Sequence, residues 1–251
     1  MLRRNPNSVF GPGAHVFPGG AVDTVDSDPN VYARTHGIDD GRASRLVGVA
    51  NDGLRYWLAA AREAFEESGF LLGSGRAEFH QERDAINSET ASWPSALDKH
   101  DVEMDLGSVG IFAHWLTPEG SPRRYDTWFL IAAAPDDQEG RHDDNEVVHS
   151  EWMRPGEALQ RCREKEIDLI FPTLRTLMAI ARFSSSARLM ATVLEAQRDD
   201  VPLVVSEGSG ERIWLPGDDH DGARRGWRPL RSRLELDMRL EQTFHDTENV
   251  A

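Results

Sequence analysis

Cysteine is nearly absent from this chain, since Cys162 is the only one among 251 residues. A single cysteine permits no disulfide within the chain, which suits a reducing compartment, so we expect a cytoplasmic location. Long apolar runs are lacking as well. The apolar segment 128–134 is far shorter than the roughly 20 residues that a membrane-spanning helix requires, and no charged start is followed by an apolar signal core. We therefore expect no membrane association.

Positive charge is also scarce: 28 Lys and Arg stand against 43 Asp and Glu, which gives a formal net charge of -15. This balance argues against nucleic-acid binding, because a phosphate backbone is held mainly by Lys and Arg. An acidic protein that acts on a phosphate compound needs metal ions and a few well-placed cations. The length allows one domain with extensions, which we expect, or two small domains.

The stretch from Leu54 to Phe70 predicts an amphipathic helix. Its apolar residues recur at helical spacing and define one stripe, which indicates a buried side. These residues are Leu54, Trp57, Leu58, Ala61, Ala64 and Phe65. Gly69 supplies a left-handed stop at the end of the helix.

Three carboxylates, those of Glu63, Glu66 and Glu67, lie together on the side opposite the apolar stripe. Like charges at these spacings repel one another and destabilise an isolated helix, so their grouping indicates a use for the field that they make. The simplest use is a hard divalent cation such as Mg2+, which takes oxygen ligands and shares them with substrate phosphates. The alternative is a solvated acidic face.

The residues around these acids resemble the Nudix box. The second half of that box is R-E-U-x-E-E-x-G-U, where U is a bulky aliphatic residue, and 62–70 reads REAFEESGF, with every polar position matched and the smaller Ala64 at a U position. In the first half, Pro18-Gly19-Gly20 is similar to the family's glycine turn, and Asp26 stands where the box has Glu. The segment 27–61 separates Asp26 from Arg62 by 35 residues, whereas the short box has seven.

A box split in this way is similar to the peroxisomal acyl-CoA diphosphatase branch of the Nudix family and its bacterial relatives. The resemblance extends to AHWLTP at 113–118, to RRYDTWFLIAAAP at 123–135, and to Glu146, Trp152 and Pro155 in the spacing E-x5-W-x2-P. It covers roughly residues 1–182.

The resemblance implies an α/β fold, the Nudix α/β/α sandwich with a mixed sheet. We expect a catalytic domain over 1–183 and a C-terminal extension with helices and a hairpin over 184–251. The insertion at about 27–53 is either a lid or binding loop or a flexible excursion. Relatives of this kind are expected to carry a strand and hairpin before Leu2-Arg3-Arg4, so truncation of the N-terminal strand is an expectation.

Periodicity and turn residues predict the other elements. Strands are expected from 71, over 106–116 and over 125–134; helices over 76–90, 94–102, 155–164, from 172 and over 187–197; and a hairpin at 207–210. Four charged residues are expected on a solvated face, namely Glu78, Glu82, Arg83 and Asp84. Arg123 and Arg124 either bind an anion or lie on an exposed hairpin. The polar cluster 218–221 is more typical of a loop than of a metal site.

The resemblance also implies a hydrolase that cleaves the diphosphate bond of a nucleoside diphosphate linked to another group, most simply CoA or acyl-CoA. ADP-ribose, NADH and dinucleotides are alternatives within the same class. An alternative from another class is a non-catalytic Nudix module that senses a nucleotide. The expected partner is therefore a small molecule, and a homodimer is compatible with this scheme.

The same resemblance suggests roles for the helix residues. Glu63, Glu66 and Glu67 would hold Mg2+ or Mn2+, and Arg62 would orient the carboxylates. Asp26 either fixes Arg62 by a charge-assisted bond or serves the turn chemistry of its DSDP segment.

Outside the helix, Gly19 and Gly20 would let the backbone approach a ligand closely. The general base is Glu66, Glu67 or Glu146, because each is expected within reach of the reacting water. Glu146 is alternatively a surface acid in an acidic loop.

Overall fold

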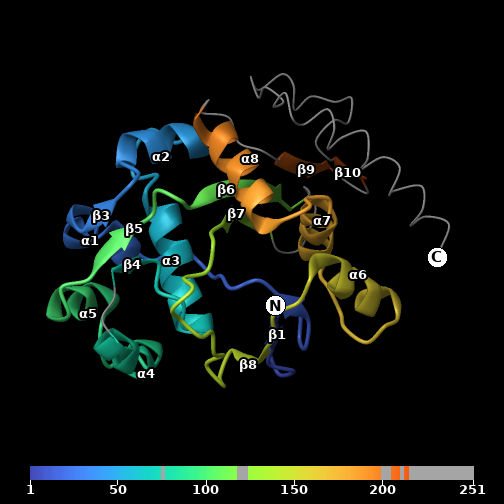
Figure 1. Ribbon diagram of the computed structural model, residues 1–251, viewed down its shortest axis with the longest axis horizontal. Coiled ribbons are helices and arrows are strands. Elements are labelled where there is room, and N and C mark those ends of the chain that lie inside the picture. The colour runs from blue at the N-terminus through green and yellow to red at the C-terminus, as the bar shows by residue number, and fades with distance from the viewer. Residues whose placement is uncertain (75–76, 118–123, 199–204, 210–211, 215–251) are drawn as a thin grey trace. The chain divides into compact units, whose positions relative to one another are not determined.

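The computed structural model describes residues 1–74, 77–117, 124–198, 205–209 and 212–214, which fall into two compact units (Figure 1). Unit 1 comprises Met1–Val109 and Ala133–Leu174; unit 2 comprises Gly110–Ala132 and the described residues from Arg175 onward. None of the described helices is both long enough and apolar enough to cross a membrane. The units divide the chain differently from the boundary predicted at residue 183, which stays a prediction.

Helix α3 (Arg55–Ser68), cyan in Figure 1, confirms the helix predicted from the apolar stripe. Trp57, Leu58 and Phe65 have no exposed surface. Gly69 follows with a φ of 78°, the left-handed conformation that ends a helix. Burial of large side chains along one face therefore holds α3 in place.

An aromatic cluster covers the buried side of α3. The ring centroid of Phe65 lies 4.9 Å from that of Phe79 and 5.6 Å from that of Trp93. These two partners belong to the 3-10 helix η2 (Ala77–Glu82) and to α5 (Trp93–Lys99), with α4 (Arg83–Asn87) between them. The helices predicted at 76–90 and from 94 are thus confirmed, the first as η2 followed by α4.

The glycine turn leaves the edge of a three-stranded antiparallel sheet in the order β2-β1-β8. Its strands are β1 (Leu2–Arg4), β2 (His15–Val16) and β8 (Val147–Ser150). Leu2, Val16 and Val147 pack together on one face. Because β2 ends two residues before the turn and Glu146 directly precedes β8, the sheet brings the turn and this acid into the same unit.

The insertion is ordered secondary structure and not a flexible excursion. It contains α1 (Pro29–Ala33), β3 (Thr35–His36) and α2 (Asp40–Val47), and β3 pairs parallel with β5 (Glu103–Asp105), which pairs antiparallel with β4 (Gly73–Ser74). The carboxylate of Asp40 accepts hydrogen bonds of 3.0 Å from the backbone N–H groups of Asp52 and Leu54. The insertion therefore fastens the start of α3.

In unit 2, β6 (Gly110–Leu116) and β7 (Asp126–Ile131) pair antiparallel. They confirm the two strands predicted over 106–116 and 125–134, although the first begins only at Gly110. Strands β9 (Val205–Ser209) and β10 (Arg212–Trp214) form the predicted hairpin, with β9 parallel to β6. Helix α8 (Ser186–Arg198) contributes to an apolar core with β6. The other predicted helices are α6 (Pro155–Arg163) in unit 1 and α7 (Phe171–Ile180), which spans the boundary between the units.

The strand predicted from Leu71 begins only at Gly73. The backbone of Leu71 bonds to a side chain and not to a neighbouring strand. The side-chain amide of Gln138 accepts from the Leu71 N–H at 2.8 Å and donates to the Leu71 carbonyl at 3.0 Å. Arg123 and the cluster 218–221 lie outside the described residues.

Candidate active site

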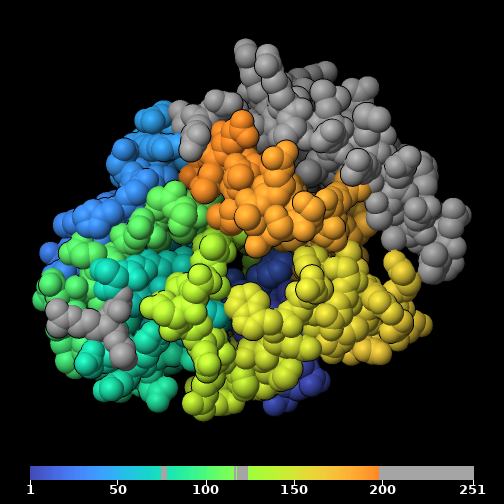
Figure 2. All heavy atoms as spheres, viewed as in Figure 1, coloured from blue at the N-terminus to red at the C-terminus, as the bar shows by residue number. Residues whose placement is uncertain are grey.

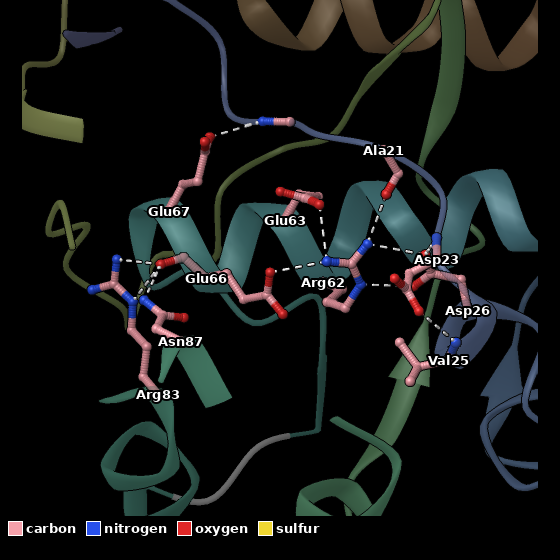
Figure 3. A network of polar contacts seen from close by, with 11 residues as sticks. Ala21, Asp23, Val25, Asp26, Arg62, Glu63, Glu66, Glu67, Arg83 and Asn87 are labelled. Atoms are coloured by element: carbon pink, nitrogen blue, oxygen red, sulfur yellow. Dashed lines mark hydrogen bonds and ion pairs between the residues drawn. The ribbon is translucent and has the colours of Figure 1, made fainter. Parts of the chain in front are cut away.

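The glycine turn lies directly against the acids of α3 (Figure 3). The Gly19 N–H donates to Oε2 of Glu67 at 2.9 Å. A Cβ atom at Gly20 would stand 2.5 Å from Oε1 of Glu63, so any other residue here would force the Glu63 carboxylate to shift. The backbone of these two glycines thus lies against the carboxylates, and its approach to a ligand stays a prediction.

Arg62, in the middle of α3, organises the acids. All five N–H donors of its guanidinium find acceptors, with distances of 2.8 to 3.0 Å. One terminal nitrogen bonds both Glu63 and Glu66, and the opposite edge forms a bidentate pair with Asp26. Burial by itself lowers the pKa of Arg62. The hydrogen bonds to Asp26 and the attraction of the glutamates outweigh this effect and raise the pKa above its ordinary value.

Asp26 fulfils both roles that the sequence leaves open. Its carboxylate is fully buried and pairs with Arg62, and it also accepts from the Asp23 N–H at 2.7 Å within the capping box of the 3-10 helix η1 (Thr24–Ser27). Although 35 residues separate Asp26 from Arg62 in the sequence, the two side chains meet because the inserted elements fold back on α3.

Burial and mutual repulsion disturb the protonation of the acids. Desolvation, with the charges of Glu63 and Glu146 adding to it, raises the pKa of Glu67 to about 8. Desolvation likewise raises the pKa of Glu63 to about 7, and it raises the pKa of Glu66. Glu67 is only 4% exposed, so the side of α3 opposite the apolar stripe is covered at this position and not solvated.

Glu146 lies near these acids although its own side chain is exposed. Its charge raises the pKa of Glu63, Glu66 and Glu67. Among the described residues its carboxylate has no hydrogen-bond partner. Glu146 therefore lies close enough to the three helix acids for its charge to act on them.

The C-terminal end of α3 is held by two residues that sequence reasoning missed. Arg83, through two of its nitrogens, and Asn87 donate to the carbonyl oxygen of Glu66 at 2.9 to 3.0 Å. The prediction that Arg83 lies on a solvated face is wrong, and burial lowers its pKa. The local sequence pattern did not predict this contact. Every helix ends in unpaired backbone carbonyls, and the pattern does not show which distant side chain will bond them.

The oxygen donors fit a hard divalent cation. In the described part of the chain, no three His, Cys, Asp or Glu side chains already converge on a metal position. Arg62 and the glycine turn hold one oxygen each of Glu63, Glu66 and Glu67, which leaves the second oxygen of each carboxylate without a bond among the described residues. Desolvated carboxylates that repel one another are suited to bind such a cation.

A cavity of about 450 Å³ lies in the insertion, lined among others by Tyr32, His36 and Arg42. It contains none of the predicted site residues. The carboxylates of α3, and not this cavity, form the candidate active site.

The fold is similar to that of a solved hydrolase. The crystal structure of the NUDIX hydrolase from Alicyclobacillus acidocaldarius matches with a TM-score of 0.62 and 24% identity, over 76% of this chain and 86% of that one. The fold is therefore the Nudix fold. A family model described as the NUDT19 Nudix domain matches residues 39–180, more than half of the chain, so the chain belongs to this family.

Curated relatives bear the same family name. Acyl-coenzyme A diphosphatase NUDT19 of Homo sapiens is 27% identical over 266 residues, which cover 87% of this chain and 71% of that protein. The protein of the same name from Gallus gallus is 28% identical over 269 residues, with the same coverage. The Nudix resemblance and the α/β fold class are thereby confirmed.

We expect Gly20→Ala to lower turnover about tenfold without unfolding the protein, because the new methyl group displaces the Glu63 carboxylate and leaves the backbone core intact. The control is Gly156→Ala, since a Cβ at Gly156 meets no atom within 4 Å. Initial rates and melting temperatures of both variants check the prediction. Equal rates in the two variants would contradict it.

We expect Glu67→Gln to change the pH dependence of stability in the absence of divalent ions. The folded pKa of about 8 exceeds the ordinary value of 4.5, so the native state binds more protons than the unfolded state between these values. Glu67 therefore lowers the free energy of unfolding of the wild type as pH rises from 4.5 to 8, by up to about 1.4 kcal/mol per pH unit. Urea unfolding in EDTA should show the free energy of unfolding of Glu67→Gln rising relative to that of the wild type between pH 4.5 and 8. The same pH dependence in both proteins would refute a raised pKa of Glu67.

Proposed function

We propose that this chain hydrolyses the diphosphate bond of CoA or an acyl-CoA, yielding a phosphopantetheine product and adenosine 3',5'-bisphosphate, with Mg2+ or Mn2+ as cofactor. The observation that supports the proposal is the grouping of the three α3 glutamates, with Glu63 and Glu67 against the glycine turn and Glu66 joined to Glu63 through Arg62. The acyl-CoA diphosphatase name of the two relatives points to the substrate.

The residues divide the work by their contacts. A divalent cation held at this site would neutralise the diphosphate charge, lower the pKa of a water molecule and help to align the displacement. Glu63, Glu66 and Glu67 would hold it through the oxygens that the described residues leave unbonded. Arg62 orients the carboxylates and does not react, because all its donors are engaged within the protein.

The proton of the attacking water passes to a carboxylate. Glu66 and Glu67 each have one oxygen held by the protein, by Arg62 and by Gly19 respectively. Neither carboxylate oxygen of Glu146 is hydrogen-bonded to a described residue, and the charge of Glu146 acts on Glu67. This difference favours Glu146 as general base, with Glu66 and Glu67 as alternatives.

A substrate panel tests the proposal. Purified protein with Mg2+ or Mn2+ is given CoA, acetyl-CoA, ADP-ribose, NADH and a diadenosine polyphosphate. We expect CoA or acetyl-CoA to be cut fastest, with adenosine 3',5'-bisphosphate as product and no turnover in EDTA. Preference for ADP-ribose or NADH would change the substrate; saturable binding without turnover of any compound would favour the nucleotide-sensing module.

We further propose that the catalytic domain spans 1–183 and that the protein acts in the cytoplasm, as its single cysteine suggests. A homodimer stays a prediction, which sedimentation of the purified protein checks.

A further inference from the structure

The two ends of the insertion meet next to Asp26, the partner of Arg62. Ser27, at the start of the insertion, donates its hydroxyl hydrogen to Oδ2 of Asp52 at 3.0 Å, although the two residues are 25 positions apart in the sequence. The insertion lies at the surface of unit 1, where its atoms, blue in Figure 2, lie beside the green atoms of β5. The bond between Ser27 and Asp52 therefore closes the insertion at its base.

The carboxylate of Asp52 joins three elements at this point. Its Oδ2 accepts from Ser27 in η1 and, at 3.3 Å, from the guanidinium of Arg55, the first residue of α3. Its Oδ1 accepts from the hydroxyl of Tyr32 in α1. Asp52 thus connects η1, which carries Asp26, to the start of α3.

The backbone around Asp52 is fixed to α2. The N–H groups of Asp52 and Leu54 donate to the carboxylate of Asp40. Between them, the N–H of Gly53 donates to Oγ of Ser44 at 2.9 Å, and a Cβ atom at Gly53 would stand 2.3 Å from the Ser44 backbone nitrogen. Asp52 itself has a φ of 61°, a left-handed conformation that costs free energy for a residue other than glycine. Such strain is retained where a side chain has a use.

We propose that Asp52 is a positioning residue, which holds Asp26 against Arg62 and thereby keeps the α3 glutamates in the arrangement that binds the divalent cation. This inference rests on the proposed function. The short box joins its two halves by seven residues, whereas here 35 residues connect them and restrain them less. A carboxylate that bonds both ends of the insertion restores this restraint. Because one nitrogen of Arg62 bonds both Glu63 and Glu66, a displaced Asp26 would displace these acids as well.

The test compares Ser27→Ala and Asp52→Ala with Asp101→Ala. Asp101 is the matched control, because it also has a left-handed φ, of 51°, and pairs with an arginine at 3.0 Å, but its side chain is 76% exposed. Electron paramagnetic resonance without substrate measures the Kd of Mn2+, and steady-state kinetics with CoA and Mn2+ measure kcat and KM.

Ser27→Ala should raise the Kd of Mn2+ and lower kcat about 3- to 10-fold, and Asp52→Ala about 10- to 30-fold, because the carboxylates lose their fixed geometry. The KM for CoA should stay within about threefold, since no contact to the nucleotide is removed. Asp101→Ala should stay within about twofold of the wild type in all three quantities.

Two further variants distinguish positioning from a general loss of packing. The double variant Ser27→Ala/Asp52→Ala should match Asp52→Ala within about twofold, because the serine hydroxyl then has no partner left to lose. If the two effects multiplied instead, Ser27 would act independently of Asp52 and the inference would be overturned. Asp52→Asn should recover part of the lost turnover, since asparagine tolerates the left-handed conformation and its carbonyl oxygen still accepts from a hydroxyl.

The outcomes separate this inference from the proposed function. If the wild type cleaves CoA and the variants of Ser27 and Asp52 match Asp101→Ala in Kd and kcat, the role of Asp52 is overturned and the hydrolase stands. If the wild type binds Mn2+ without cleaving CoA and the same variants weaken that binding, the hydrolase falls and the role of Asp52 stands. A wild type that neither cleaves CoA nor binds Mn2+ overturns both. Circular dichroism confirms folding, and Ser27→Ala decides if Asp52→Ala does not fold.

Discussion

Glu67→Gln is expected to lower turnover by about 10^3-fold or more while the protein stays folded. The carboxylate of Glu67 is 4% exposed, and one of its oxygens accepts from the Gly19 N–H. Glutamine has the same shape and keeps that hydrogen bond through its carbonyl oxygen. It lacks the charge with which Glu67 would hold a divalent cation, so the variant isolates the charge from the packing.

Two measurements on this variant separate charge from structure. Initial rates with Mg2+ give the loss of turnover, and melting temperatures with increasing Mg2+ report binding to the folded state. We expect Mg2+ to stabilise the wild type and to have little effect on Glu67→Gln. The control is Glu78→Gln, an exposed acid on η2, which should behave as the wild type in both. Full activity of Glu67→Gln would remove this residue from the set of metal ligands.

Asp26→Ala is expected to destabilise the protein by about 3–5 kcal/mol, because it leaves the buried charge of Arg62 without its bidentate partner. Asp26 has no exposed surface and Arg62 is 7% exposed. The same substitution removes an acceptor from the η1 capping box. Turnover should fall as well, since Arg62 would be free to shift the carboxylates of Glu63 and Glu66.

The matched control for this ion pair is Asp98→Ala. Asp98 also pairs with an arginine, Arg34, at 2.9 Å, but its side chain is 74% exposed. Exposed pairs contribute about 0.2–1 kcal/mol, so urea unfolding should show a small loss for Asp98→Ala and a large one for Asp26→Ala. Equal losses in the two variants would show that burial of the Asp26 pair adds nothing.

The local pattern predicted α3 well because its signal is short-range. A stripe of large apolar residues, a glycine stop and three acids all lie within one stretch of chain, and helical geometry alone puts them in register. The pairing of Asp26 with Arg62 came from resemblance to the box and not from spacing, since 35 residues separate the two.

The insertion shows where sequence reasoning stopped. Its polar composition allowed a lid or a flexible excursion, whereas the structure has Asp40 accepting from two backbone N–H groups at the start of α3. Arg83 was expected on a solvated face because its neighbours in the sequence are also polar. Both side chains find backbone partners far along the chain, and composition does not record such contacts.

The sequence by itself determined the helix, the order of most elements and the identity of the acids, because these depend on neighbours within a few turns or strands. Only the tertiary structure decided that Glu67 is buried against the glycine turn and that all five donors of the Arg62 guanidinium are used. The physical reason is that burial and electrostatic fields depend on which distant segments meet, and pKa values follow those fields.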